Sequence, residues 1–300
     1  MKHLSLILHL ALVIMIIAIS GLFNVFMTDQ ISAKPLSTFT TGIAVKNEAV
    51  PQEAKLVSGP WVGSRWSDEN EKWLIQFRDP KRLSQIPYIN LYTIAGMASA
   101  KKKLTDCNVG AKPEKTLCVN GANFIREYKA QLLQSYTDTA NAIKTNYGID
   151  KPIFLHFEPD LYQYNSNIQK DRGLSFDEIS EMVNSWTDIF KATLPNASLV
   201  MDVSPWNSDL KGWSKKLRNF DYAGLVGRRF EPEPMIRNSK GKDLMTYAQI
   251  VKLTGKKLIV DDAHGPGGKW LPYNPNWDKL ELYNARFEDG IIAVIQPPIK

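Results

Sequence analysis

Short apolar runs alternate with amphipathic stretches along most of the chain. Six runs of four to eight residues, rich in Val, Ile, Leu and aromatic side chains, predict buried strands. They are Pro87–Ile94, Pro152–Phe157, Ser198–Val203, Tyr222–Val226, Lys257–Val260 and Gly290–Ile295. A weaker first strand is predicted at Gly42–Val45.

Helical periodicity occupies the stretches between these runs. The predicted helices are Phe124–Tyr147, Ser175–Leu194 and Leu244–Thr254. Ser175 and Glu178 form a capping box, and Gly255 ends the third helix. Strands that alternate with helices indicate a parallel sheet. The number of strands favours an α/β fold, a (β/α) barrel of seven or eight strands, with a distorted TIM barrel as one form. An open doubly wound sheet is the alternative, although the glycine-rich loop expected after its first strand is missing.

The amino terminus has the pattern of an export signal. Lys2 precedes an almost wholly apolar stretch from Leu4 to Met27. Ile31-Ser32-Ala33 would suit cleavage, but the stretch is also long enough for a retained signal anchor, since about 20 apolar residues span a bilayer. A buried core helix is the structural alternative. No cysteine lies near the end of the stretch, which excludes a lipoprotein.

Three parts of the chain follow from these patterns. Residues 1–33 are the predicted signal peptide or anchor, residues 34–58 a linker with a first strand, and residues 59–300 a single barrel domain. Cys107 and Cys118 are the only cysteines and lie eleven positions apart. In an exported protein such a pair indicates a disulfide, with free thiols or a metal site as the weaker alternatives. The expected location is extracytoplasmic, whether secreted, periplasmic or anchored at the membrane by an uncleaved N-terminal segment.

Composition excludes some classes of partner. The net charge of +6 comes with scattered basic pairs and triplets such as Lys101-Lys102-Lys103. These do not form an extended basic patch with interleaved aromatic residues, so a nucleic-acid partner is not expected.

Candidate chemistry lies where the predicted strands end, because barrel active sites form at the carboxyl ends of the strands. His156, Glu158 and Asp160 surround the end of one strand and would share a face if the chain stayed extended. Crowded carboxylates at such a place suit acid–base chemistry, because crowding separates their pKa values. A purely structural carboxylate is the alternative.

Two further strand ends carry polar and aromatic residues. Asp202 lies within an apolar strand, where a charge is costly unless it is paired or lines a polar cavity. Trp206 follows it. The later segment Asp261–Trp270 contains Asp262, His264 and several glycines before Trp270. Arg228 and Arg229 follow another strand and place cations near the barrel mouth.

Aromatic residues gather in the same loops. They are Tyr162, Tyr164, Trp206, Trp213, Trp270, Tyr273 and Trp277. Flat rings stack on the apolar faces of sugars while carboxylates bind the hydroxyl groups, so this combination predicts a carbohydrate site. The predicted substrate contacts are His156, Tyr162, Asp202, Trp206, Asp262, His264 and Trp270. Some of these rings would instead pack the loops onto the barrel.

Two segments resemble the family-six glycoside hydrolases, cellulases with a distorted seven-stranded barrel. Phe154–Leu161 (FLHFEPDL) is similar to that family's strand ending in Glu-Pro-Asp. Leu258–Pro275 (LIVDDAHGPGGKWLPYNP) is similar to its late strand and glycine-rich loop. The resemblance implies catalytic roles for Glu158, Asp160 and Asp261, with Asp261 as the base.

One departure from that family concerns the acid. The family places its acid in an aspartate-rich loop after an early strand, where this chain has Tyr92–Met97 without a carboxylate. Asp106 is the nearby substitute. Either Glu158 has taken the role of the acid, or the protein binds glycans without cleaving them.

Three functions follow as hypotheses. The first is an exported glycoside hydrolase that acts on a polysaccharide through two carboxylates, without a cofactor or metal. The second is a non-catalytic envelope protein that binds polysaccharide. The third is a metal-dependent polysaccharide deacetylase with His156, Asp262 and His264 as ligands, although the spacing of a zinc motif is absent.

Overall fold

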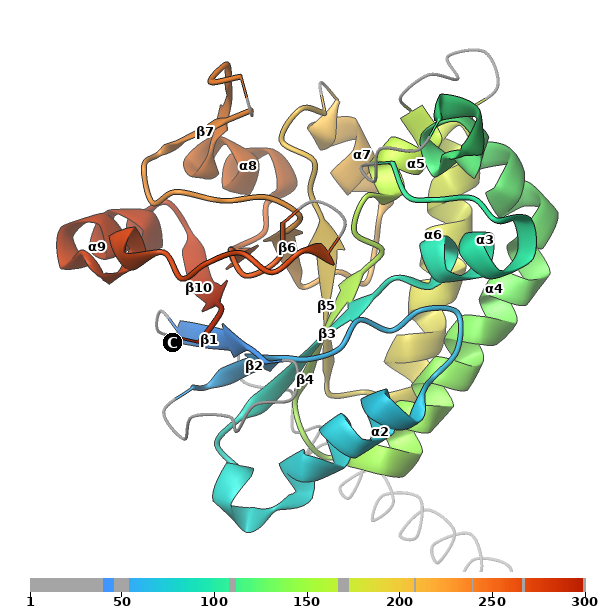
Figure 1. Cartoon of the computed structure of the whole chain (residues 1–300), viewed down its shortest axis with the longest axis horizontal. Helices are drawn as coiled ribbons and strands as arrows, with labels where there is room; N and C mark the ends of the chain where they lie inside the picture. The colour runs from blue at the N-terminus through green and yellow to red at the C-terminus, as the bar shows by residue number, and fades with distance from the viewer. Residues whose placement is uncertain are drawn as a thin grey trace, which may run out of the picture. The chain divides into compact units, whose positions relative to one another are not determined.

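Eight parallel strands close into a barrel in the computed structural model of the chain (Figure 1). The structure describes residues 40–45, 54–107, 112–166, 173–207, 209–238, 240–265 and 268–298. The barrel strands are β1 (Thr40–Ala44), β2 (Leu56–Ser58), β3 (Ile86–Leu91), β4 (Ile153–Phe157), β5 (Ala197–Asp202), β6 (Tyr222–Leu225), β9 (Leu258–Asp261) and β10 (Ile291–Gln296). Parallel pairing of β1 with β10 closes the ring. The predicted (β/α) barrel is therefore confirmed.

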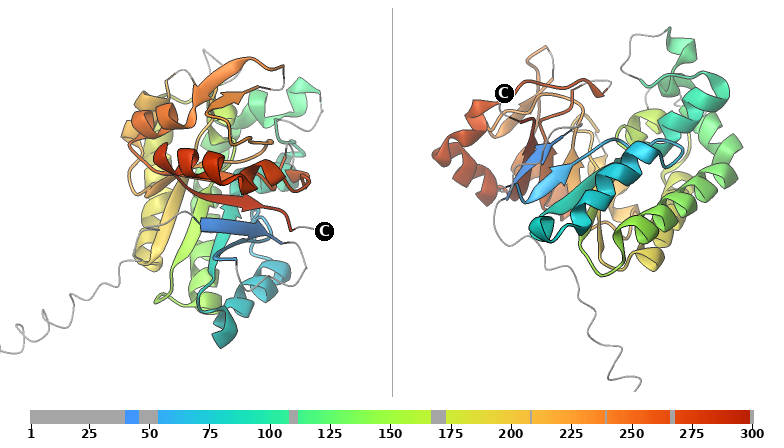
Figure 2. Two further views of the ribbon diagram at one scale, coloured as in Figure 1. Left: turned by 90° about the vertical axis from the view of Figure 1, so that its left-hand side faces the viewer. Right: turned by 60° about the horizontal axis from the view of Figure 1, so that its bottom comes forward.

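The helices between the strands cover the outside of the barrel. They are α2 (Asp68–Ile75), α3 (Thr93–Lys102), α4 (Leu117–Tyr147), α5 (Leu161–Ser166), α6 (Phe176–Thr193), α7 (Leu210–Lys216), α8 (Tyr247–Thr254) and α9 (Leu280–Glu288). Helix α4 lies against α2, α3, α5 and α6, and Figure 2 shows α2 beside α4. Among the described residues, no helix is long and apolar enough to cross a membrane.

Local sequence signals explain several element boundaries. Ser175 caps α6 and Glu178 completes the predicted capping box, which satisfies free amide groups at the helix start. The predicted helix at Phe124–Tyr147 begins earlier, at Leu117, and bends at Tyr128, whose φ and ψ are −106° and 15°. The predicted helix at Leu244–Thr254 begins later, at Tyr247.

A short antiparallel hairpin takes the place of that first turn of helix. Its strands are β7 (Met235–Arg237) and β8 (Asp243–Thr246). Thr246 caps α8 with its side chain, so the extended backbone before it belongs to β8. The hairpin lies outside the barrel, between β6 and α8 in the chain.

Alternate side chains along the strands fill the barrel interior. In β4, Phe154 belongs to the interior cluster with Tyr88, Val200 and Tyr222. Leu155 and Phe157 instead join the larger cluster between the strands and the helices. This division follows from the two-residue period of a strand buried on both faces.

The described residues cover only part of the predicted amino-terminal segments. Strands β1 and β2 fall within residues 34–58, the segment predicted to hold a linker and a first strand. The predicted signal or anchor at 1–33 lies outside the described residues. Pro35–Lys300 forms one compact unit by its internal contacts.

Candidate functional site

A pocket of about 510 Å³ lies at the carboxyl ends of the barrel strands. We call it the mouth pocket. Its lining residues are Val45, Gly59, Pro60, Trp61, Glu69, Tyr92, Asp106, His264, Gly268 and Trp270. Val45, Gly59, Tyr92 and His264 follow β1, β2, β3 and β9 directly or within a few residues. The pocket thus occupies the position at which barrel enzymes place their active sites.

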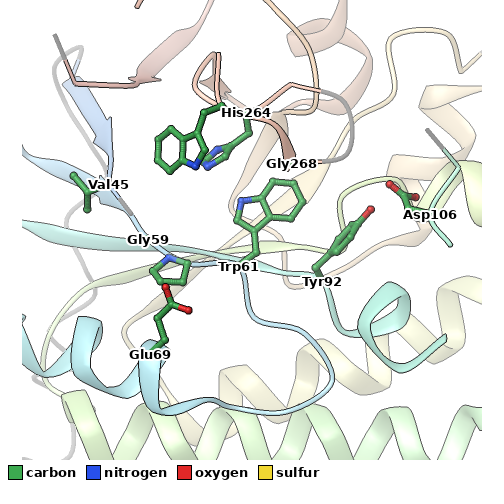
Figure 3. Close-up of a pocket in the computed structure, with 10 residues that line it drawn as sticks. Val45, Gly59, Trp61, Glu69, Tyr92, Asp106, His264 and Gly268 are labelled. Atoms are coloured by element: carbon green, nitrogen blue, oxygen red, sulfur yellow. The ribbon is translucent and has the colours of Figure 1, made fainter. Parts of the chain in front are cut away.

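Aromatic rings form most of one wall of the mouth pocket. Figure 3 shows Trp61 between His264 and Tyr92. The Trp61 ring lies 5.0 Å from Tyr92 and 5.4 Å from His264, in edge-to-face contacts. The His264 ring lies 4.9 Å from that of Trp270, which is 40% exposed. The indole Nε1 of Trp61 is buried and makes no hydrogen bond within the described residues.

Asp261 and His264 form a buried pair at the end of β9. The Oδ2 atom of Asp261 lies 2.9 Å from Nδ1 of His264. The same carboxylate accepts hydrogen bonds from the backbone amides of Ala263 and His264, at 2.9 and 3.2 Å. These contacts hold His264 in the pocket wall while its carboxylate partner is fully buried behind it. Nδ1 is occupied, which leaves Nε2 as the ring atom available for proton transfer.

A second acidic group lies beyond Tyr92, on the other side of Trp61. Asp106 lines the mouth pocket, and its Oδ1 accepts a hydrogen bond of 3.1 Å from the hydroxyl of Tyr164. The carboxylates of Asp106 and Asp202 lie near enough to Asp160 for their charges to act on it. Burial, followed by the charges of Asp106 and Asp202, raises the pKa of Asp160 well above its ordinary value. The protonated form of Asp160 is therefore favoured relative to that of an exposed aspartate.

Glu158 does not line the mouth pocket. Its φ of 48° ends the extended alternation of β4, so Glu158 does not follow His156 into the barrel. The carboxylate instead accepts hydrogen bonds from the backbone amides of Thr93 and Ile94 and from the hydroxyl of Tyr136, at 2.7 Å. It lies fully buried at the start of α3, where the helix dipole favours a negative charge.

Burial and hydrogen bonding act on Glu158 in opposite directions. Burial is the larger effect and raises its pKa to about 7, against the hydrogen bonds from Tyr136, Thr93 and Ile94 that favour the charged form. The sequence-based expectation that His156, Glu158 and Asp160 share one face is not met, because a left-handed backbone at Glu158 and again at Asp160 turns the chain.

His156 and Asp202 meet inside the barrel. The Nε2 atom of His156 lies 3.3 Å from Oδ1 of Asp202, and its ring lies 5.8 Å from that of Tyr88. The Tyr88 hydroxyl is buried without a hydrogen-bond partner among the described residues. Burial, then the charges of Asp261 and Asp202, raise the pKa of Tyr88. The polar interior thus runs from the Asp202 side towards Asp261.

Asp262 belongs to the support of the loops. Its carboxylate accepts hydrogen bonds from the Phe230 amide at 2.7 Å, from Arg229 at 3.1 Å and from the Asn274 side chain at 3.1 Å. Burial raises the pKa of Asp262 to about 6, although these contacts act against the increase. The structure therefore separates Asp262 from His264, although the two are close in sequence.

The predicted aromatic contacts divide between the pocket and the loops. Trp270 lines the mouth pocket. Trp206 is 41% exposed and lies outside it. Tyr162 packs its ring 6.2 Å from Trp213, which is itself buried. Tyr164 is fully buried and reaches Asp106 through its hydroxyl.

The two cysteines form the predicted disulfide. Cys107 and Cys118 are bonded, with their Cα atoms 5.1 Å apart. The bond ties the segment that carries Asp106 to the first turn of α4. Thr105 and Thr116 pair beside it as a short parallel bridge. The disulfide therefore braces the wall of the mouth pocket that Asp106 belongs to.

The residues that follow β2 were not among the predicted site residues. Trp61 and Glu69 line the mouth pocket, yet no strand was predicted at Leu56–Ser58 directly before them. The strand has only three residues, Leu56–Ser58, which is too short to show a period. A tryptophan within Gly59-Pro60-Trp61 was the available signal.

The residues proposed as metal ligands do not gather. Within the ranges that the structure describes, no group of three His, Cys, Asp or Glu side chains could hold a metal ion. His156 pairs with Asp202, His264 with Asp261, and Asp262 with Arg229. This arrangement gives no support to the deacetylase hypothesis.

The similarity of this chain to known proteins lies in its structure and not in its sequence. No protein-family model and no curated protein matches the sequence. The chain is similar to the Bacillus subtilis mannanase BCman, with a TM-score of 0.51 and 11% identity over 87% of this chain and 80% of that one. It is also similar to an endo-β-1,4-mannanase double mutant from Cellulomonas fimi, with a TM-score of 0.52 and 11% identity over 87% of this chain and 65% of that one.

The chain has the (β/α)-barrel fold of these glycoside hydrolases. The predicted resemblance to barrel glycoside hydrolases is thereby confirmed for the fold. A mutant of the cellobiohydrolase Cel6A from Humicola insolens is a further similar structure, with a TM-score of 0.47 and 15% identity over 74% of this chain and 66% of that one.

Proposed function

We propose that the chain is an exported glycoside hydrolase that cleaves a polysaccharide bound in the mouth pocket. One arrangement supports this most directly. Acidic groups lie on both sides of the aromatic residues Trp61 and Tyr92, with Asp106 on one side and the pair of Asp261 and His264 on the other. A sugar ring that packs on Trp61 would have a carboxylate system on either side of its glycosidic bond.

The two acidic groups differ in the way that acid–base cleavage requires. Burial and the charges of Asp106 and Asp202 raise the pKa of Asp160 and favour its protonated form. Asp160 would therefore hold the proton, and Asp106, which lines the pocket, would pass that proton to the leaving oxygen. Across the pocket, His264 would take a proton from the attacking water, and Asp261 would stabilise the charge that His264 acquires. The water oxygen forms the new bond to the sugar carbon as the glycosidic bond breaks.

Glu158 would support the site and not take part in the chemistry. It fixes the start of α3 directly after Tyr92, which belongs to the pocket wall. The disulfide and the predicted export signal are consistent with work outside the cytoplasm, where disulfides persist. The similar structures described as mannanases make β-1,4-mannan the first polymer to test.

Hydrolysis is tested by incubating the purified chain with β-mannan and with a panel of other plant and bacterial polysaccharides. Release of reducing ends by the wild type, and its loss in a variant carrying both Asp106→Asn and Asp261→Asn, would support the proposal. A chain that neither binds nor cleaves any polymer of the panel would refute it.

Glycan binding without cleavage is the second candidate function. Asp261 favours it, because this carboxylate is fully buried and already accepts hydrogen bonds from two backbone amides and His264. Such a chain would retain polysaccharide in affinity electrophoresis but release no reducing ends. Trp61→Ala would then weaken retention, whereas Asp261→Asn would leave it unchanged.

A further inference from the structure

A second cavity, of about 250 Å³, lies between the end of β6, the hairpin β7–β8 and α8. We call it the arginine cavity. It is lined by Arg228, Arg229, Phe230, Glu231, Glu233, Met235, Ile236, Arg237, Asn238 and Tyr247. The hairpin and α8 lie beside each other at one side of the barrel (Figure 1). None of the proposed catalytic residues lines this cavity.

The three arginines of the cavity differ in their partners. Arg229 pairs with Asp262 at 3.1 Å, and Arg237 pairs with Asp243 at 2.8 Å. Within the part of the chain that the structure describes, no carboxylate pairs with Arg228. Its guanidinium lies over the Phe230 ring at 5.6 Å and makes one long hydrogen bond of 3.4 Å, from Nε to the Arg229 carbonyl.

The acidic residues of the cavity do not neutralise Arg228. The Glu231 carboxylate accepts hydrogen bonds from the side chains of Asn274 and Asn276, at 3.2 and 3.0 Å. Glu233 is exposed to solvent. Arg228 is partly buried, and this burial lowers its pKa. A partly desolvated cation without a counter-charge is costly, and an oxyanion that accepts two parallel hydrogen bonds from the guanidinium would offset that cost.

The chain that lines the arginine cavity contacts the loop that carries His264 of the mouth pocket. The Gly227 amide donates to the carbonyl of His264 at 3.1 Å. Arg229 donates to the carbonyl of Pro272 at 2.5 Å. The chain after β6 therefore contacts His264 and Pro272, which belong to the same loop as Trp270, and His264 and Trp270 line the mouth pocket. A polymer that crosses the mouth of the barrel could reach both the mouth pocket and the arginine cavity.

We propose that the arginine cavity binds an oxyanion through Arg228, namely a carboxylate or a phosphate ester carried by the polysaccharide whose sugar ring lies in the mouth pocket. The anion site is inferred from the cavity and from Arg228, which has no carboxylate partner among the described residues. Its assignment to a substituent of the substrate rests on the proposed function. The substrate class becomes an acidic rather than a neutral polysaccharide.

The test compares matched ligands by isothermal titration calorimetry. Tetrameric β-1,4-oligomannuronate and mannotetraose differ only in the carboxylate at each sixth carbon. Mannose 6-phosphate and mannose form the pair for a phosphate ester, and inorganic phosphate probes the cavity alone. A carboxylate or phosphate that binds a guanidinium should give the wild type about a ten-fold preference for the charged member of at least one pair.

Variants assign that preference to Arg228. Arg228→Gln should abolish it, and so should Met235→Glu, which places a carboxylate in the cavity and guards against a folding defect in the first variant. Arg218→Gln is the matched control, because it removes the same charge from a surface pair with Asp188. This control should keep the preference of the wild type.

Each outcome is decisive. Equal binding of charged and neutral sugars by the wild type, or an unchanged preference in Arg228→Gln, overturns the anion site while leaving the proposed function standing. Phosphate binding that disappears in Arg228→Gln, without any sugar binding, supports the anion site and refutes the proposed function.

Discussion

Asp261 holds His264 by its Nδ1 atom at 2.9 Å, in the wall of the mouth pocket. The carboxylate has no exposed surface, whereas the imidazole touches both Trp61 and Trp270. A buried carboxylate fixes the tautomer and orientation of its histidine partner. The pair therefore presents one defined nitrogen, Nε2, to a ligand.

Replacing Asp261 by Asn should remove the charge that stabilises a protonated His264. We expect the rate of polysaccharide hydrolysis to fall by about 10²–10⁴-fold, the range of general acid–base catalysis. The Asn side chain keeps an oxygen for the amide of Ala263, so the thermal unfolding midpoint should change little. Initial rates of reducing-end release and a melting curve of the same sample measure both. Undiminished hydrolysis would exclude Asp261 from the mechanism.

Asp202 should control the alkaline side of the pH profile through Asp160. Burial is the largest cause of the raised pKa of Asp160, and the charges of Asp106 and Asp202 raise this pKa further. A group that donates a proton becomes inactive as the pH rises through its pKa. Asp202→Asn removes one neighbouring charge, so the alkaline limb of kcat/KM should move to lower pH. A limb that stays in place, or moves to higher pH, contradicts a role for Asp160 in holding the proton.

Glu158 should make stability depend on pH. Its pKa rises from 4.5 in the unfolded chain to about 7 in the fold, so its contribution is fully present below 4.5 and is lost as the pH rises through 7. Relative to Glu158→Gln, the wild type should lose about 3 kcal/mol of unfolding free energy between pH 4 and pH 8. Urea unfolding at both pH values measures the difference.

A matched variant separates this effect from general loss of a carboxylate. Glu178 is exposed, and its hydrogen bond with Arg126 lowers its pKa. Glu178→Gln should therefore retain the decline of the wild type towards alkaline pH. A pH dependence that is the same in all three proteins would rule out the assignment to Glu158.

Trp61 should carry a large share of the binding free energy for glycans. Truncation of a central aromatic contact costs about 2 kcal/mol, so Trp61→Ala should weaken binding about thirty-fold. Trp206 is 41% exposed and lies outside the mouth pocket, so Trp206→Ala should leave binding almost unchanged. Affinity electrophoresis or calorimetry on the cleaved or retained polymer compares the two. Equal losses would place the sugar elsewhere on the barrel face.

The disulfide should contribute both stability and affinity. A double Cys107→Ala and Cys118→Ala variant should lose about 3 kcal/mol of unfolding free energy, because a short closed loop restricts the unfolded chain. It should also bind glycans more weakly, since Asp106 adjoins Cys107 in the pocket wall. Urea unfolding with and without a reductant measures the first effect. A wild-type protein that is insensitive to reductant would contradict it.

Six of the barrel strands were predictable because their apolar runs are long and bounded. In β4, the sequence alternates between residues for the interior, such as Phe154, and residues for the helices, such as Leu155. The capping box of Ser175 and Glu178 was equally visible, since it depends on two residues three positions apart. Such local rules identified the barrel and the strand ends.

The site itself depended on features without a local signature. Glu158 lies one residue beyond β4, yet its positive φ sends the carboxylate to Tyr136 on α4, a contact between residues 22 positions apart. Trp61 follows β2, and that strand is too short to show alternation in the sequence. Asp106 was the substitute that the sequence offered for the acid, and the predicted disulfide of the adjacent Cys107 ties its segment to α4, but its place in the pocket wall depends on the fold.

The loop that carries His264 and Pro272 also fixes the spacing between the mouth pocket and the arginine cavity. Asp262 anchors it through Arg229 and Asn274, and Asp261 anchors its other end through His264. The span from the aromatic rings to the Arg228 guanidinium is therefore set by the fold and not by the ligand. A polymer whose charged groups recur at that span would fill both sites together, and one with another period would fill only one at a time.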